Sequence, residues 1–163
     1  MRGHRMIVEM SKDTFTTCDD YFLGWRCIEP FVLDVRGKDD DYKARVYSQL
    51  NDGQKALFSF YIFFNHAKNS LEEFIYWSNY FYLQPETWAE IKKGSRYLNL
   101  HRFEFFIDQF EQATEEMTKN NSHRDIDQFC TLFFIFGDHV TPTIQQISHY
   151  IKEHPDEFIL LKD

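Results

Sequence analysis

Apolar residues recur along most of this chain at intervals of three and four, the period of an amphipathic helix. In residues 14–36 the pattern is interrupted by Pro30, which lacks an amide proton and should break or kink a helix. The predicted helical segments are 14–36, 42–50, 54–68, 71–83, 86–93, 97–117, 126–136 and 141–154, with one more turn at 156–161.

Residues that favour helix ends separate these segments. Ser70 and Glu73 have the spacing of a capping box, in which the Ser side chain accepts an amide proton and the Glu side chain reaches back. Pro85 suits the first position of a helix, and Gly94 its carboxyl end. Gly137 is expected to end a helix before Thr141 and Pro142 begin the last one.

The segment 54–68 is apolar on almost every side, which is typical of a central helix packed on several sides. A buried strand at 58–64 is the alternative, but its flanks carry Gln, Lys and Ala instead of turn residues. We therefore predict an all-α fold: a single bundle-like domain of about six to eight helices over residues 14–163, preceded by a frayed tail at residues 1–13.

Composition and charge narrow the classes of function. Of the 163 residues 43% are hydrophobic, which excludes a disordered chain, and the net charge of −8 excludes a broad electropositive surface for nucleic acid. No apolar run approaches the roughly 20 residues of a membrane span, and the N-terminus has no secretory pattern. Three cysteines without a CxxC motif favour the cytoplasm.

A row of acids marks the segment 97–117. Glu104, Asp108, Glu111 and Glu115 are spaced four, three and four apart, so a helix places them on one face. Residues 103–117 contain five acids and no Lys or Arg. Like charges at this spacing repel, so the row indicates either a surface for a basic partner or a solvated face of an acidic protein.

Aromatic residues are in excess, and 18 of them are phenylalanine. Six lie off the main apolar faces: Phe58, Phe63, Tyr76, Tyr80, Tyr82 and Trp88. Most phenylalanines are expected in the core. The tyrosines between residues 76 and 82, which are Tyr76, Tyr80 and Tyr82, are the better interface candidates, because a tyrosine hydroxyl needs water or a partner.

Histidines offer an alternative. His101, Glu104, His139 and His149 are candidate metal ligands for a helical-bundle enzyme, although the chain has no Glu-x-x-His or His-x-x-x-His. A pocket for an apolar ligand among the phenylalanines is a further alternative. Phosphate-loop, dinucleotide and nucleophile-elbow motifs are absent from the sequence, so we expect no enzyme activity and no cofactor.

The segment Leu50-Asn51-Asp52-Gly53-Gln54-Lys55-Ala56-Leu57, which continues into an aromatic-rich helix up to His66, resembles the opening of a bacterial family of small all-helical domains. That family includes a DNA-mimic protein that occupies the DNA-binding face of a transcription factor. Its Asn-Gly-Gly-Phe turn has no counterpart in residues 65–70. The resemblance implies an acidic helical protein that acts by binding another protein, and it assigns no functional residue.

Charge and aromatic pattern lead to the same expectation. We expect a non-enzymatic cytoplasmic protein, a regulator, inhibitor or immunity-type factor, that contacts an unidentified basic protein. The contact would use Glu104–Glu115, bordered by Tyr76 and Tyr80. No nucleic-acid or membrane partner is expected, and the sequence leaves the oligomeric state open, homo-oligomers included.

Overall fold

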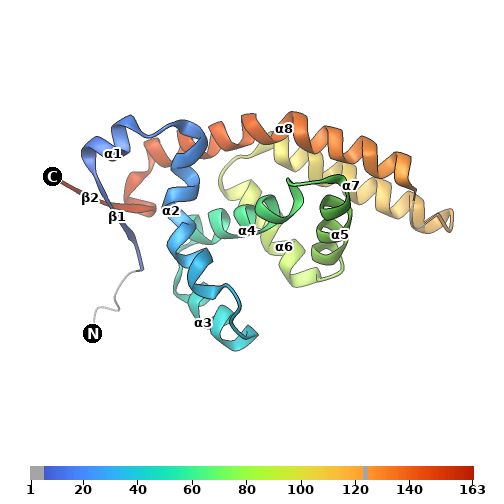
Figure 1. Ribbon diagram of the computed structural model, residues 1–163, viewed down its shortest axis with the longest axis horizontal. Helices are drawn as coiled ribbons and strands as arrows, with labels where there is room; N and C mark the ends of the chain where they lie inside the picture. Colours follow the sequence, from blue (N-terminus) through green and yellow to red (C-terminus); the bar gives the residue numbers. More distant parts are fainter. Residues whose placement is uncertain (1–5, 123–124) are drawn as a thin grey trace.

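The computed structural model describes residues 6–122 and 125–163. This part of the chain contains eight α-helices, one short 3-10 helix and two short strands (Figure 1). In chain order they are β1 (Val8–Ser11), α1 (Lys12–Thr17), α2 (Asp20–Val35), α3 (Asp40–Gln49), α4 (Asp52–Ala67), α5 (Leu71–Tyr82), α6 (Pro85–Tyr97), α7 (His101–Lys119), α8 (Ile126–Glu153), the 3-10 helix η1 (Pro155–Glu157) and β2 (Ile159–Lys162). The predicted all-α class is confirmed.

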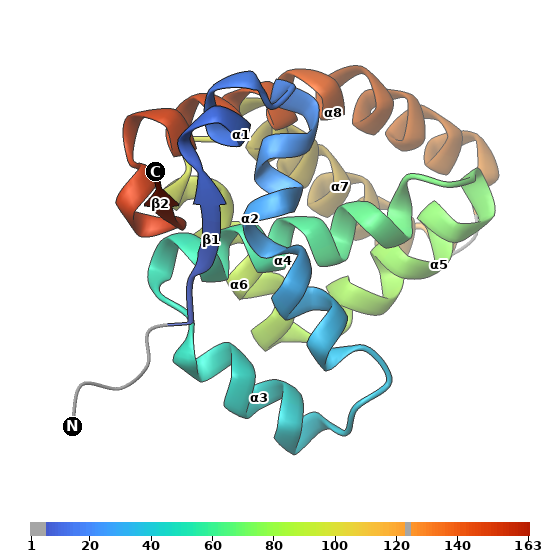
Figure 2. The same ribbon diagram turned by 60° about the vertical axis from the view of Figure 1, so that its left-hand side comes forward.

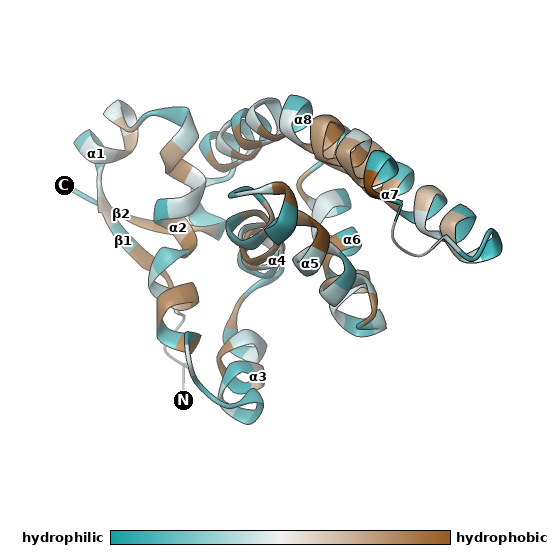
Figure 3. Cartoon of the chain, turned by 45° about the vertical axis from the view of Figure 1, so that its right-hand side comes forward, coloured by the Kyte–Doolittle hydropathy of each residue, from teal (hydrophilic) through white to brown (hydrophobic). Residues whose placement is uncertain are grey.

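Helix α4 is the centre of the fold. Eleven of its sixteen residues are buried, and it packs against α2, α5 and α6. In Figures 1 and 2, α7 and α8 form a long antiparallel pair beside it, and in Figure 3 the middle of α8 shows a continuous hydrophobic stretch. The central helix predicted at 54–68 is therefore confirmed, and the alternative strand at 58–64 is wrong.

Helix α8 is one continuous helix of 28 residues, although two helices were predicted, at 126–136 and 141–154, with a break at residues 137–140. Pro142 removes a single backbone hydrogen bond, whereas the apolar face stays buried on both sides of it, at Phe136 and Ile144. Within the described residues no helix has the length and apolarity needed to cross a bilayer.

Helix α2 also differs from the prediction for the segment 14–36, both in where it starts and at Pro30. It starts only at Asp20, because the side chain of Asp19 accepts the amide proton of Tyr21 and caps it. It then runs through the exposed Pro30 to Val35. Burial of one apolar face, which includes Phe31, outweighs the loss of one backbone hydrogen bond.

Gly94 was predicted to end a helix, but it lies inside α6, which continues to Tyr97. A Cβ atom at Gly94 would lie 2.9 Å from Cα of Ala56, so only glycine allows α6 to approach α4 this closely. The glycine therefore marks a crossing of two helices and not a helix end.

The two ends of the described chain lie together. Strand β1 pairs in parallel with β2, with Val8 opposite Ile159 and Ser11 opposite Lys162. Residues 1–13 were expected to form a frayed tail, whereas Val8–Ser11 is a strand and Met10 is buried. Residues 1–5 of that tail lie outside the described residues. The turn predicted at 156–161 is a 3-10 helix followed by a strand.

A hydrogen-bonded cluster at the start of α4 holds both terminal segments. Asn51 and Gln54 form a capping box, in which each side chain accepts the backbone amide proton of the other residue. The Nδ2 atom of Asn51 donates to the carbonyl of Glu157 at 2.6 Å, and Nε2 of the buried Gln54 donates to the carbonyl of Met6 at 2.6 Å. The box predicted at Ser70 forms only in part: Ser70 caps Glu73, whose carboxylate instead accepts from Asn69.

Candidate functional site

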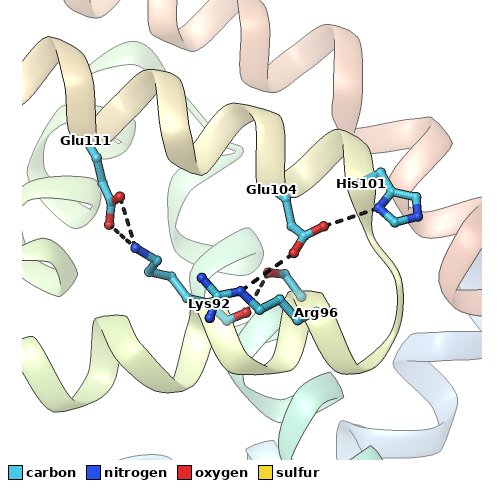
Figure 4. Close-up of polar contacts among 6 residues, drawn as sticks. Lys92, Arg96, His101, Glu104 and Glu111 are labelled. Carbon is cyan, nitrogen blue, oxygen red and sulfur yellow. Dashed lines mark hydrogen bonds and ion pairs between the residues drawn. The ribbon is translucent and has the colours of Figure 1, made fainter.

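The predicted acidic row lies on α7, on the side that faces α6. Helix α7 carries Glu104, Asp108, Glu111 and Glu115 on one face, as the spacing predicts. Figure 4 shows that the side chains of Glu104 and Glu111 reach toward cations of α6. Part of the row is therefore an internal contact between two helices.

Glu111 is the best-anchored member of the row. Its carboxylate accepts from Nζ of Lys92 at 2.7 and 3.0 Å and from the indole Nε1 of Trp88 at 2.7 Å. The side chain is only 26% exposed. Burial acts to raise the pKa of Glu111, but the hydrogen bonds from Lys92 and Trp88 outweigh it, so the pKa is lowered and the group is ionised at neutral pH.

Glu104 is held more loosely. One carboxylate oxygen lies 3.9 Å from Nε of Arg96, and the other lies 3.3 Å from Nδ1 of His101 on its own helix (Figure 4). Asp108 and Glu115 are exposed, and no ion pair joins either of them to another described residue. The prediction of an unneutralised row is therefore wrong at Glu104 and Glu111.

The sequence contained a signal for this compensation. Lys92 and Arg96 are spaced four apart on α6, so they lie on one face of that helix. What the sequence alone did not show is that this face packs against α7. Once the two helices are adjacent, the cations of α6 meet the acids of α7.

The predicted tyrosines lie on the outer face of α5. Tyr76 is 62% exposed, Tyr80 is 46% exposed, and Leu83, directly after the helix, is 76% exposed. The rings of Tyr76 and Tyr80 are nearly parallel, with centroids 6.3 Å apart and an interplanar angle of 11°. Together with the exposed Glu72, one turn before Tyr76, these residues form the α5 ridge (Glu72, Tyr76, Tyr80 and Leu83).

An aromatic cluster connects the α5 ridge to the core. Trp77 lies edge-on to both exposed tyrosines, with centroids 5.1 Å from Tyr76 and 5.4 Å from Tyr80. It stacks on the buried Phe81 at 5.9 Å, and the ring of His66 on α4 lies 4.0 Å from it. Burial lowers the pKa of His66, so its imidazole is neutral at pH 7. The ridge is thus supported by packed rings and contains no charged imidazole.

The other off-face aromatics belong to the core. Phe58, Phe63 and Trp88 are buried, and Tyr82 is half-buried against Trp88 and Phe110. The expectation that most phenylalanines fill the core is confirmed at these positions. Tyr76 and Tyr80 differ from them because their side chains are exposed.

The alternative metal ligands do not form a site. His101 contacts Glu104, His149 lies 3.4 Å from Glu153 on its own helix, and the ring of His139 faces Phe105 at 5.4 Å. Across residues 6–122 and 125–163, no three His, Cys, Asp or Glu side chains are arranged to hold a metal ion. The predicted constellation of His101, Glu104, His139 and His149 is therefore wrong.

A small cavity lies between α4 and α6, and it is too small for an organic ligand. It is lined by Lys55, Glu90, Lys93 and Tyr97, among others, and its volume of about 10 Å³ accommodates a single water molecule. Of the cysteines, Cys27 is buried, and burial raises the pKa of its thiol to about 12, which makes it a poor nucleophile.

Comparison with known proteins adds no family to this description. No family model, curated protein or solved structure matches the chain. The resemblance seen in residues 50–66 therefore stays an expectation from the sequence.

Proposed function

We propose that this protein acts in the cytoplasm by binding a basic partner protein, as a regulator, inhibitor or immunity-type factor and not as an enzyme. The observation that carries the proposal is the α5 ridge. Tyr76 and Tyr80 on α5 and Leu83 directly after it expose large apolar side chains in succession, although the same chain buries most of its other rings. Aromatic residues are enriched in the cores of protein interfaces.

Charge supports a basic partner. From Asn69 to Ile91 the chain has four glutamates and no Lys or Arg. Asp108 and Glu115 on α7 add two exposed acids outside this segment. A negative surface around an apolar centre speeds the encounter with a positive surface and disfavours acidic partners. Glu104 and Glu111 are not assigned to the contact, because α6 already pairs with them.

The experiment starts from the natural partner. Affinity capture from the native host with the whole chain as bait, followed by mass spectrometry, identifies the partner, which is then purified and titrated. Tyr76→Ser combined with Tyr80→Ser is expected to weaken the purified complex at least tenfold. Phe134→Ser is the control, because Phe134 on α8 is also an exposed aromatic ring, 73% exposed.

Two further measurements separate the surfaces. Asp108→Lys combined with Glu115→Lys should slow association a few-fold and flatten its salt dependence, with dissociation nearly unchanged. Full affinity in the tyrosine double variant, together with a loss in Phe134→Ser, would move the contact to α8. An acidic partner whose affinity rises with salt would refute the charge argument.

A further inference from the structure

In the part of the chain that the structure describes, Lys and Arg side chains lie over several aromatic rings, but over none of the rings of the α5 ridge. Arg45 lies 4.9 Å above the ring of Tyr42, and Lys68 lies 4.6 Å above the ring of Phe64. Within the described residues no Lys or Arg takes such a place over Tyr76, Trp77 or Tyr80. Three adjacent electron-rich rings are thus left without a cation, in a protein that uses this contact elsewhere.

Two glutamates lie in the first turn of α5, close to Tyr76, the first exposed ring of the helix. Glu72 and Glu73 precede Tyr76 by four and three residues, so both lie one helical turn from it and on either side of it. Both are exposed. The Oε2 atom of Glu73 accepts from Nδ2 of Asn69 at 2.6 Å, which orients this carboxylate. A cation over Tyr76 would be attracted by the ring and by both carboxylates.

We propose that the partner of the α5 ridge contributes an arginine, whose guanidinium lies against Tyr76 and Tyr80 and donates to Glu72 or Glu73. This inference rests on the proposed function and names the chemistry of its contact. Arginine fits better than lysine, because the planar guanidinium stacks on rings, is weakly hydrated and donates two parallel hydrogen bonds to a carboxylate.

The ridge also defines the size of the segment that binds. From Glu72 to Leu83 the helix rises about 16 Å, at about 1.5 Å per residue. A partner helix of three turns has this length. It would place the arginine near the glutamate end of the ridge and an apolar side chain beside Leu83. A second copy of this chain is disfavoured as the partner, because its own α5 ridge lies in residues 71–83, which contain two glutamates and no Lys or Arg and so supply no cation.

Model peptides test the arginine directly. The probe is a 14-residue acetylated helical peptide with arginines at two successive turns and leucine at the far end. Two matched peptides replace the arginines by lysine or by citrulline, which keeps the shape and removes the charge. Binding to the whole ¹⁵N-labelled chain is followed by amide chemical shifts. We expect shifts concentrated in Leu71–Leu83, with citrulline binding at least tenfold weaker than arginine and lysine in between.

Variants of the chain locate the contact. Tyr76→Leu with Tyr80→Leu keeps an apolar surface without rings and should weaken the arginine peptide about five- to thirty-fold. Tyr76→Phe with Tyr80→Phe keeps the rings and should bind as tightly as the wild type. Phe134→Leu is the control for an exposed ring elsewhere and should have no effect.

Several outcomes would overturn the inference. Equal binding of the arginine and citrulline peptides, no shift at millimolar peptide, or full binding by the leucine double variant each removes the arginine contact. Such a result leaves the proposed function intact if the purified natural partner still loses affinity in the tyrosine-to-serine variant. If single-stranded oligonucleotide displaces the arginine peptide from the ridge, the ligand class itself is wrong.

Discussion

Replacing Gly94 by alanine should destabilise the crossing of α4 and α6. The new Cβ would lie 2.9 Å from Cα, 3.2 Å from O and 3.3 Å from Cβ of Ala56, whereas ordinary contacts of this kind are 3.4–4 Å. Backbone atoms cannot rotate away, so the two helices must move apart. Overpacking of this kind costs about 1–3 kcal/mol, and the better helix propensity of alanine returns about 1 kcal/mol. We expect the free energy of unfolding to fall by about 1 kcal/mol.

Gly137 provides the matched control, because it is also inside a helix but has no neighbour within 4 Å of its new Cβ. Gly137→Ala should raise the free energy of unfolding by about 0.5–1 kcal/mol. Urea denaturation followed by circular dichroism measures both variants, and a thermal scan should separate their midpoints by about 3–8 °C. The reasoning is refuted if Gly94→Ala is as stable as Gly137→Ala, because the two substitutions are chemically identical and differ only in what the methyl group meets.

Three further predictions concern the ion pair, the cap and the exposed acids. Glu111→Gln removes the ionic partner of Lys92 and should lower the free energy of unfolding by about 1–2 kcal/mol at pH 7. Because the pKa of Glu111 is lowered in the folded state, this loss should shrink as the pH falls below about 4.3, the ordinary pKa of a glutamate. Urea midpoints of the wild type and the variant at several pH values measure it. Asn51→Ala removes the cap of α4 and a tether to the C-terminal segment, so it should cost about 1–2 kcal/mol and speed amide exchange in β2. Asp108→Lys with Glu115→Lys should change the free energy of unfolding by less than about 0.5 kcal/mol in the same urea assay, because both side chains are exposed.

Helix positions could be predicted from the sequence, but several helix ends could not. The period of apolar residues places α4 correctly because a helix that is apolar all round has to be central. Gly94, Gly137 and Pro142 were interpreted as helix ends from local propensity. In each case the surrounding helix is kept by burial of an apolar face against other helices, an energy that local propensity does not contain.

At the candidate site, too, the sequence predicts local features correctly but not those that depend on neighbouring helices. The helical phase of Glu104, Asp108, Glu111 and Glu115 is set by local spacing and is correct. Whether these acids form a free negative surface depends on α6, because Lys92 of α6 pairs with Glu111. The position of α6 beside α7 is set by the tertiary fold and not by the local sequence. The exposure of Tyr76 and Tyr80 could be predicted, because both lie off the apolar face of α5 and a tyrosine hydroxyl favours water or a partner. Tyr82 had the same prediction but is half-buried against Trp88 and Phe110, which come from other helices.

The segment 50–57 has a structural role. Gly53 has no room for a side chain, because a Cβ there would lie 2.7 Å from Oε2 of Glu157 and 2.9 Å from the ring of Phe158. The side-chain amide of the buried Gln54 donates a hydrogen bond to the carbonyl of Met6, and that of Asn51 donates to the carbonyl of Glu157. Asn51, Gly53 and Gln54 therefore hold the two ends of the described chain against the start of α4.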